Sequence, residues 1–563
     1  MIKLIYSYFG FVFMSQQGQP IVILGGGSGQ TKGKDAQKNN ITAAKLIATI
    51  VRTSLGPRGM DKMLVDSIGD VTITNDGATI LKEIDVQHPA AKMMVEISKA
   101  TDNEVGDGTT SSVVLAGALL EKAQELLDKD VHPTVIVDGY ANAAEKAIEI
   151  LNRIAVKVDT KDTKLLEKVA ATSLASKLVS EDSKELSSIV VEAVLKIAEK
   201  DSTGKYKVDK SNIKIEKKAG GSIADTELIQ GITLDKEVIH AGMPKRVTKV
   251  KIAMVNAPLE VEKTEMSAEI RINDPAQMQA FLDEENNILK TMVDKIKSVG
   301  ATLLVCQKGI DDVAQHYLSA NKIMACRRIR ESDMTKLAKA TGGRVVANIE
   351  DLSKADLGYA ELAEERKIED DKWVFIEGAK NPKSVTILTR GGSQRIVDEA
   401  ERSINDAVMV IKDVLEKPAI VAGGGSGESL AAHELLKWSE KLSGREQLAV
   451  QAFAEALESI PLSLAENAGL DPIDIQVKLR NANSEGKKWI GVNVNSGSVS
   501  NLFDQNILEP LSVKEQIIKA ANEASGLILR IDDVIASGKQ EAGAGMPGGP
   551  MMTPGSMPMM GGM

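Results

Sequence analysis

The order of the patterns along the chain is the feature that most constrains its fold. Helical periodicity dominates residues 40–155, strand-like alternation begins near residue 230, and helical periodicity returns from about residue 394. Segments of mixed, charged pattern separate these blocks. A chain of 563 residues is too long for one compact core, and about three domains are expected. The order helical, mixed, β-rich, mixed, helical favours a nested chain in which the two ends build one domain.

Composition and charge exclude several classes of protein. The net charge is −10, and only three Trp, six Tyr and seven Phe are present, so neither a basic surface nor a stacking platform for nucleic acid is expected. The two cysteines show no zinc-binding spacing and fit a reducing, cytoplasmic setting. No run of about 18 apolar residues predicts a transmembrane helix. Residues 1–13 are interpreted as an upstream extension, with Met14 as the working start.

The stretch VGDGTTSSVVLAGALL, residues 105–120, leads from a glycine-rich turn into an apolar helix. The N–H groups of Gly108, Thr109, Thr110 and Ser111 open this helix, and a helix N-terminus suits phosphate. Asp107 beside phosphate is repulsive unless a divalent cation lies between them, and Mg²⁺ binds one or two carboxylates together with phosphate oxygens. Taken alone, the stretch is more typical of a capped helix start.

Other short segments are also ambiguous by themselves. LGPRGMDKM (55–63) predicts a helix stop, and TNDGAT (74–79) predicts a turn at a strand end. Asp406 in ERSINDAV lies off the apolar face of its helix and is predicted to be solvated. AGGGSG (422–427) is either a nucleotide-approach loop or a linker. Ser512 and Glu515 have the spacing of a capping box at the start of the last long helix.

The ordered set of these segments resembles one known family. LGPRGMDKM, TNDG, GDGTT, ERSINDA and AGGG follow one another over about 370 residues. NDGATILKEIDVQHPAAK (75–92), GITLDKE (231–237) and ILEPLSVKEQ (507–516) support the same resemblance. The chain resembles a group II chaperonin, the family of the archaeal thermosome and the eukaryotic cytosolic chaperonin, from about residue 30 to 538.

The resemblance implies a multidomain α+β chaperonin fold. It has a mainly helical equatorial domain, a small α/β intermediate domain and an α/β apical domain with a helical protrusion that acts as a lid. The implied boundaries are 31–161 and 419–538 for the equatorial domain, 162–230 and 385–418 for the intermediate domain, and 231–384 for the apical domain with its protrusion at about 258–297. Residues 1–30 and the Gly/Met/Pro tail 539–563 are expected to be disordered.

The resemblance also implies roles for individual residues. Asp76 and Asp406 are implied as the catalytic residues that orient and activate the attacking water, and Asp107 as the magnesium ligand. Lys177 resembles a γ-phosphate sensor, and Glu509 is implied near the ribose hydroxyls. The implied nucleotide-binding residues are Leu55, Gly56, Pro57, Gly106, Asp107, Gly108, Thr109, Thr110, Ser111, Lys177, Gly424, Gly425 and Glu509.

The expected function is therefore that of an ATPase subunit, dependent on ATP and Mg²⁺, that encloses non-native polypeptides in a stacked double ring and promotes their folding. The ring is expected to need no separate lid co-chaperonin, no nucleic acid and no membrane. Two other hypotheses are a small-molecule kinase or phosphatase, and a nucleotide-independent ring or filament subunit. A kinase or phosphatase needs a substrate pocket with its own polar groups, and the sequence between residues 230 and 385 shows no such cluster. A nucleotide-independent scaffold has no use for the carboxylates.

Overall fold

The computed structural model describes residues 5–7, 10–14, 20–22, 29–177, 179–261, 275–379 and 383–536. The terminal segments and residues 41–529 form separate compact units. In the terminal unit, β1 (Ile5–Ser7), β2 (Gly10–Met14) and β3 (Pro20–Val22) form an antiparallel sheet where the sequence predicted no order. β4 (Gly29–Lys32), which begins inside the segment 1–30 that was expected to be disordered, pairs with β24 (Asp533–Ala536).

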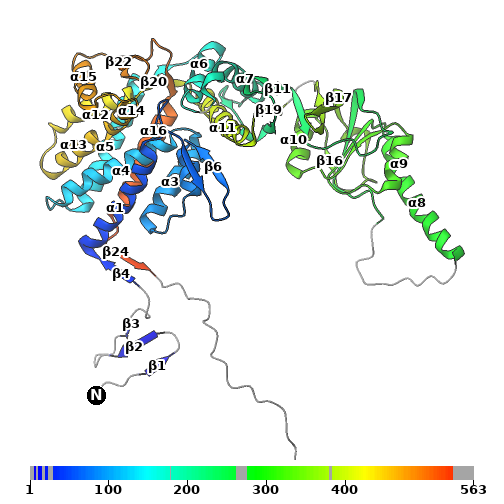
Figure 1. Ribbon diagram of the computed structural model, residues 1–563, viewed down its shortest axis with the longest axis horizontal. Helices are drawn as coiled ribbons and strands as arrows, with labels where there is room; N and C mark the ends of the chain where they lie inside the picture. Colours follow the sequence, from blue (N-terminus) through cyan, green and yellow to red (C-terminus); the bar gives the residue numbers. More distant parts are fainter. Residues whose placement is uncertain are drawn as a thin grey trace, which may run out of the picture. The chain divides into compact units, whose positions relative to one another are not determined.

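Within residues 41–529, the largest apolar cluster, here called the helical core, draws on both halves of the chain. Figure 1 shows its helices packed side by side, and α16 contacts both α4 and α5. Pro89 and Pro133 stand at the first positions of two of these helices, where proline is tolerated because that N–H has no helical partner. The helices are α1 (Gly33–Arg52), α2 (Gly77–Glu83), α3 (Pro89–Val105), α4 (Thr109–Leu127), α5 (Pro133–Ile154), α12 (Ser426–Ser439), α13 (Gly444–Leu457), α14 (Ser459–Asn467), α15 (Pro472–Ser484) and α16 (Leu511–Leu529).

Short strands complete the elements around the helical core. They are the hairpin of β5 (Lys62–Val65) and β6 (Val71–Thr74), the hairpin of β21 (Ile490–Asn493) and β22 (Ser498–Asn501), and the sheet of β7 (Val156–Lys157), β20 (Ala419–Ala422) and β23 (Leu508–Pro510). Among the described residues, the stretch Gly444–Asn467 is long and apolar enough to cross a membrane by length and composition, and 72% of its most apolar window is buried inside the fold. Its side chains Phe453 and Leu457 lie in the helical core.

A second cluster, here called the bridging core, joins residues before and after the β-rich block. Three helices pack together in it: α6 (Thr163–Leu174), α7 (Ser183–Ile197) and α11 (Gln394–Glu416). They cover a sheet in which β19 (Val385–Gly391) lies between β10 (Ile213–Ala219), which is parallel to it, and β11 (Glu227–Ile229), which is antiparallel. The hairpin of β8 (Glu199–Lys200) and β9 (Tyr206–Lys207) follows α7.

The third cluster, here called the sheet core, belongs entirely to the middle of the chain. Two short apolar runs of the sequence form β14 (Leu303–Cys306) and β15 (Met324–Cys326), which are parallel and are connected by α9 (Asp312–Ala320) in a strand, helix, strand unit. The other strands of the sheet are β12 (Gly231–Leu234), β13 (Arg246–Val255), β16 (Val345–Val346), β17 (Gly358–Ile368) and β18 (Asp371–Glu377), with α10 (Glu331–Thr341) beside β12.

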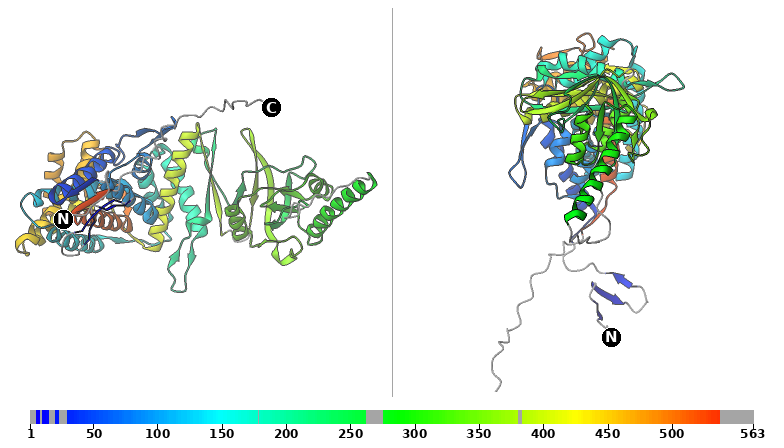
Figure 2. Two further views of the ribbon diagram at one scale, coloured as in Figure 1. Left: turned by 90° about the horizontal axis from the view of Figure 1, so that it is seen from below. Right: turned by 90° about the vertical axis from the view of Figure 1, so that its right-hand side faces the viewer.

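Residues 262–274 belong to the expected lid at about 258–297 and lie outside the described residues. Helix α8 (Pro275–Ser298) follows them. Figure 2 shows α8 extending past the end of the sheet, and it contacts α9. Its C-terminal half reaches the sheet core through Leu289, Val293 and Ile296, whereas Met278 and Phe281 are exposed.

The predicted capping box at the start of α16 is wrong. The helix begins at Leu511, so Ser512 and Glu515 lie inside it. The Ser512 hydroxyl instead donates to Asp413 on α11 at 3.3 Å, and Glu515 accepts from Lys417 at 2.6 Å. Both side chains thus connect α16 to the chain that leaves the bridging core.

Candidate functional site

Two helices begin next to each other, and Asp76 joins them. Its Oδ2 caps α2 by accepting from the backbone N–H of Thr79 at 2.8 Å and from the Thr79 hydroxyl at 2.7 Å. Its Oδ1 accepts from the hydroxyl of Thr109, the first residue of α4, at 3.1 Å. A side chain at Gly77 would lie 2.9 Å from the Cα of Thr110, so glycine lets the two helix starts approach. Asp76 is therefore held next to the N-terminus of α4.

The first turn of α4 has backbone donors to spare. Its N-cap is Gly108, which has no side chain to occupy them, and no side chain from elsewhere in the described residues caps the helix. The N–H of Gly108 donates to the Asp107 carboxylate at 2.7 Å. The sequence predicted this N–H among the groups that bind phosphate. The N–H groups of residues 109–111 thus remain as donors at the positive end of the helix dipole, which is an arrangement that binds phosphate.

Asp406 is buried, so the prediction of a solvated carboxylate is wrong. It lies on α11 with 6% of its surface exposed, although the helical wheel put it off the apolar face. The partner that compensates its burial is Lys177, in the turn after α6, and the ammonium group and the Asp406 carboxylate form an ion pair. Both side chains are 8% exposed. A wheel calculated for one helix cannot show that a second helix covers its polar side.

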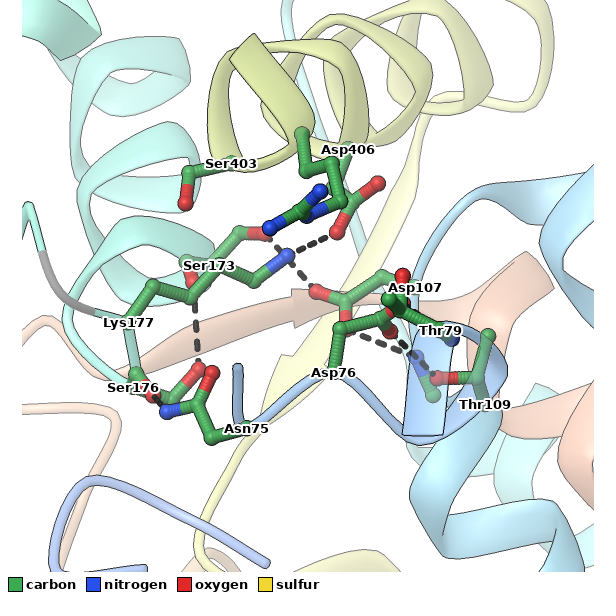
Figure 3. A network of polar contacts seen from close by, with 12 residues as sticks. Asn75, Asp76, Thr79, Asp107, Thr109, Ser173, Ser176, Lys177, Ser403 and Asp406 are labelled. Carbon is green, nitrogen blue, oxygen red and sulfur yellow. Dashed lines mark hydrogen bonds and ion pairs between the residues drawn. The ribbon is translucent and has the colours of Figure 1, made fainter. Parts of the chain in front are cut away.

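Asp107 is brought to the same place by tight packing. Gly106 ends α3 with φ 70°, and a side chain there would lie 2.7 Å from Cγ of Met409 on α11. Asp107 Oδ2 accepts from the Ser173 hydroxyl of α6 at 2.8 Å. Asn75 Nδ2 donates to the backbone carbonyl of the nearby Ser176 at 2.7 Å. Figure 3 shows the carboxylates of Asp76, Asp107 and Asp406 converging on the end of Lys177.

The electrostatics of this cluster favour an additional cation. Burial alone would lower the pKa of Lys177, but Asp406, Asp107 and Asp76 outweigh it and raise that pKa, so the ammonium form persists. Burial raises the pKa of Asp406, Lys177 opposes this, and the other two carboxylates add to it. Three carboxylates around one ammonium carry a net charge of −2 when ionised. A fourth acid, Asp102 on α3, has its pKa raised by burial and then by Asp76.

The glycine-rich turn and Glu509 lie together beside the start of α16. β20, which precedes the turn, pairs with β23, and Val421 is opposite Glu509 in the register. Gly424 and Gly425 have left-handed φ values of 61° and 72°, and Gly425 is the N-cap of α12 without a side-chain cap. Glu509 forms an ion pair with Lys514 at 2.5 Å. Burial raises the pKa of Glu509, and Asp107 is among the groups that add to it.

The turn Leu55–Pro57 is held by a different helix. The Asn467 side chain of α14 donates to the Leu55 carbonyl at 2.9 Å, and a side chain at Gly56 would collide with Leu464 of α14. Among the described residues, no hydrogen bond connects this turn to Asp76 or Asp107. A cavity of about 430 Å³ lies between α6 and α7 and is lined by none of the predicted site residues.

Sequence reasoning missed several residues that the structure brings to this site. Ser173 and Asn75 connect the helical and bridging cores through single hydrogen bonds. Asp102 precedes GDGTT by only a few residues, so its position on the last turn of α3 was a signal that could have been used. Lys514 lies in SVKEQ and carries no signal beyond its charge, because its buried partner Glu428 is 86 residues away in the chain.

The arrangement can bind a nucleoside triphosphate with a divalent cation. Among the described residues, no group of three or more His, Cys, Asp or Glu is arranged to hold a metal ion by itself. Mg²⁺ does not need such a cage, because phosphates and waters supply most of its ligands. One carboxylate at Asp107, a surplus of negative charge and unused helix N–H groups therefore fit Mg²⁺ with a polyphosphate.

Comparisons with known proteins agree with this chemistry. A model of the TCP-1/cpn60 chaperonin family matches residues 47–539. The chain is 57% identical to the thermosome subunit alpha of Archaeoglobus fulgidus over 521 residues, which are 92% of this chain and 95% of that protein. It is 56% identical to the thermosome subunit of Pyrococcus abyssi over 93% of this chain and 95% of that protein. The thermosome subunit beta of Archaeoglobus fulgidus is 53% identical over 95% of this chain and 99% of that protein.

Identity at this level over nearly the whole chain, together with the family match, determines the fold class and the general function. The fold is the multidomain α+β chaperonin fold, and the activity is ATP hydrolysis that drives protein folding. This chain therefore belongs to the TCP-1/cpn60 chaperonin family.

Proposed function

We propose that ATP is hydrolysed where Asp76, Asp107 and Asp406 converge on Lys177 at the uncapped start of α4. This convergence is the observation that carries the proposal. Phosphoryl transfer depends on positioning and on neutralising charge more than on covalent chemistry. The N–H groups of residues 109–111 bind phosphate oxygens, and Lys177 faces the γ-phosphate. Asp76 and Asp406 orient the attacking water and accept its proton.

Asp107 is proposed as the protein ligand of Mg²⁺. When bound, Mg²⁺ offsets the negative charge of the phosphates. Asp107 already faces this position, because its Oδ1 is fixed by Gly108 and its Oδ2 by Ser173. The net charge of −2 around Lys177 supports the same assignment. Both carboxylate oxygens keep spare acceptor capacity, since each one accepts a single hydrogen bond in the structure.

The base and sugar of the nucleotide are proposed to lie toward the remaining predicted residues. Gly424 and Gly425 allow the backbone to approach the ribose, and Glu509 accepts hydrogen bonds from its hydroxyl groups. The turn of Leu55, Gly56 and Pro57 lines the nucleotide on another side. Asp107 is near enough to Glu509 to raise the pKa of its carboxyl group, which supports one continuous site for phosphate and ribose.

Hydrolysis is proposed to depend on closure between the helical and bridging cores. Asp76 and Asp107 belong to elements of the helical core, whereas Asp406 and Lys177 belong to α11 and to the turn after α6 in the bridging core. Water is held by both catalytic carboxylates only when the two cores meet. The hydrogen bonds from Ser173 and Asn75 are the contacts that form at closure.

The assembly is proposed to be a stacked double ring in the cytoplasm, formed with itself or with paralogues, that takes up non-native polypeptides. The three cores are proposed to correspond to equatorial, intermediate and apical domains with the boundaries predicted from the sequence. Helix α8 belongs to the proposed built-in lid, and no separate lid protein is required. The exposed apolar side chains of the β5–β6 hairpin, Met63 and Val65, support contact between subunits, because such patches mark interaction surfaces.

The test uses isosteric variants of the assembled particle. Asp76→Asn and Asp406→Asn should each lower the rate of ATP hydrolysis by at least about 100-fold, since general-base groups contribute that much or more. Binding of ATP should be retained. Asp398→Asn is the matched control, because Asp398 lies on α11 but pairs with Lys217 away from the site. Unchanged turnover in both site variants would refute the proposal.

A further inference from the structure

A buried ion cluster lies directly behind the proposed ribose end of the nucleotide site. Lys514, on the first turns of α16, donates to Glu428 of α12 at 2.8 Å and lies 2.5 Å from Glu509 of β23. The side chain of Lys514 is 5% exposed and that of Glu428 is 2% exposed. Glu509 is the only member that reaches solvent appreciably, with 26% of its side chain exposed. Lys514 and Glu428 are thus the buried part of the cluster, and the Glu509 carboxylate lies at the surface of the site.

The surroundings leave Glu509 little freedom. A side chain at Gly423 would collide with Oε1 of Glu509, so the glycine-rich turn lies against this carboxylate. Val513, the neighbour of Lys514, contacts the position of Gly108 at the start of α4, where a side chain would lie 3.1 Å from it. The same turn of α16 therefore borders both the proposed phosphate end and the proposed ribose end.

Charge explains why Lys514 is needed. Glu428 and Glu509 are two carboxylates that share one ammonium group, and Oε2 of Glu428 has no hydrogen-bond partner among the described residues. Without the ammonium, the two carboxylates would repel each other, and a buried carboxylate without a partner is strongly disfavoured. Glu509 would then turn toward solvent or take up a proton. Either change removes an ionised acceptor from the place where ribose hydroxyl groups are expected.

We propose that Lys514, anchored by Glu428, is a positioning residue that holds the Glu509 carboxylate ionised and aimed at the ribose hydroxyl groups, and so sets the preference for ribonucleotides. This inference rests on the proposed ribose contact of Glu509. Lys514 does not touch the nucleotide. Its effect is expected on the discrimination between ribose and deoxyribose, which general damage to the fold would not change.

The test compares the affinities of ATP and 2′,3′-dideoxy-ATP for the full-length, assembled particle by competition. Hydrogen bonds to a carboxylate predict that wild type binds ATP about 10- to 100-fold more tightly. Glu509→Gln should reduce this ratio to about threefold or less. The variant Lys514→Met/Glu428→Met removes the buried pair together, which cores often tolerate, and should reduce the ratio equally. Adding Glu509→Gln to that variant should reduce it no further, because the three residues act as one unit.

The matched control is Lys417→Met/Glu515→Met, which removes an ion pair between Glu515 of α16 and Lys417 at the end of α11, and it should keep the wild-type ratio because Glu509 is not part of this pair. If Lys514→Met/Glu428→Met fails to assemble, Lys514→Gln replaces it and should lower the ratio at least threefold. A wild-type ratio in the Lys514 variant together with a lost ratio in Glu509→Gln overturns the positioning role and leaves the ribose contact in place. A wild-type ratio in Glu509→Gln overturns the ribose contact itself and the inference with it.

Discussion

Replacing Lys177 with methionine should affect stability and catalysis through one cause. Among the described residues, the Lys177 ammonium is the only cation that forms an ion pair with Asp406, and both side chains are 8% exposed. Removing one partner of a buried ion pair costs about 3–5 kcal/mol, because the other charge is left uncompensated. We therefore expect Lys177→Met to lower the free energy of unfolding by about that amount at pH 8. Hydrolysis should also fall, since a protonated Asp406 cannot accept a proton.

The pH dependence tests this reasoning more sharply than the size of the effect. The raised pKa of Lys177 keeps the stabilising contribution of its ammonium form fully present below pH 10.5. In the variant, the pKa of Asp406 should rise further, since its one opposing cation is gone. The folded variant then binds a proton that the unfolded chain releases above about pH 4, so its stability falls as pH rises.

The assay is denaturant unfolding of wild type, Lys177→Met and Lys177→Met/Asp406→Asn between pH 5 and 8. The deficit of Lys177→Met should shrink toward pH 5, and the double variant should recover most of the lost stability because no charge is left unpaired. A deficit that is the same at every pH, or a double variant no more stable than the single one, would refute the account of the buried pair.

Three other predictions follow from separate features. Gly106→Ala should weaken binding of Mg-ATP at least about tenfold by equilibrium titration, because its φ of 70° and its contact with Met409 leave no space beside Asp107. Burial raises the pKa of Asp413 to about 7, so this group should make stability fall as pH rises from 4 to 7, and Asp413→Asn should reduce that slope in unfolding titrations. Met63→Glu, on the exposed hairpin, should reduce the assembled fraction in light scattering without unfolding the subunit.

Much of the secondary structure could be predicted because its signals are local. Pro89 and Pro133 interrupt the helical pattern where α3 and α5 begin, and short continuous apolar runs form β14 and β15 on either side of α9. The capping box failed for a physical reason. Ser512 and Glu515 have the required spacing, but Asp413 and Lys417 offer them charged partners from another part of the chain.

The candidate site also contains features that could be predicted from local sequence and features that could not. GDGTT could be predicted as a helix start, since its glycines and the following residues are contiguous in sequence, whereas its role in binding phosphate was implied by the family resemblance. The burial of Asp406 could not, because it depends on Lys177, which is more than 200 residues away in the chain. Lys514 was missed because its partner Glu428 is also distant in the chain. Pairings between distant segments follow from the fold, and a single helix or turn does not encode them.

The central claim is that the start of α4, with Asp107, holds the phosphates and Mg²⁺ between Asp76 and Asp406. The most direct measurement is a structure of the assembled particle with ADP, Mg²⁺ and aluminium fluoride. The account predicts that the metal contacts Asp107, that the fluoride group lies between Asp76 and Asp406 within reach of Lys177, and that the N–H groups of residues 109–111 bind phosphate oxygens. Nucleotide bound at any other place, or a fluoride group remote from both catalytic carboxylates, would contradict it.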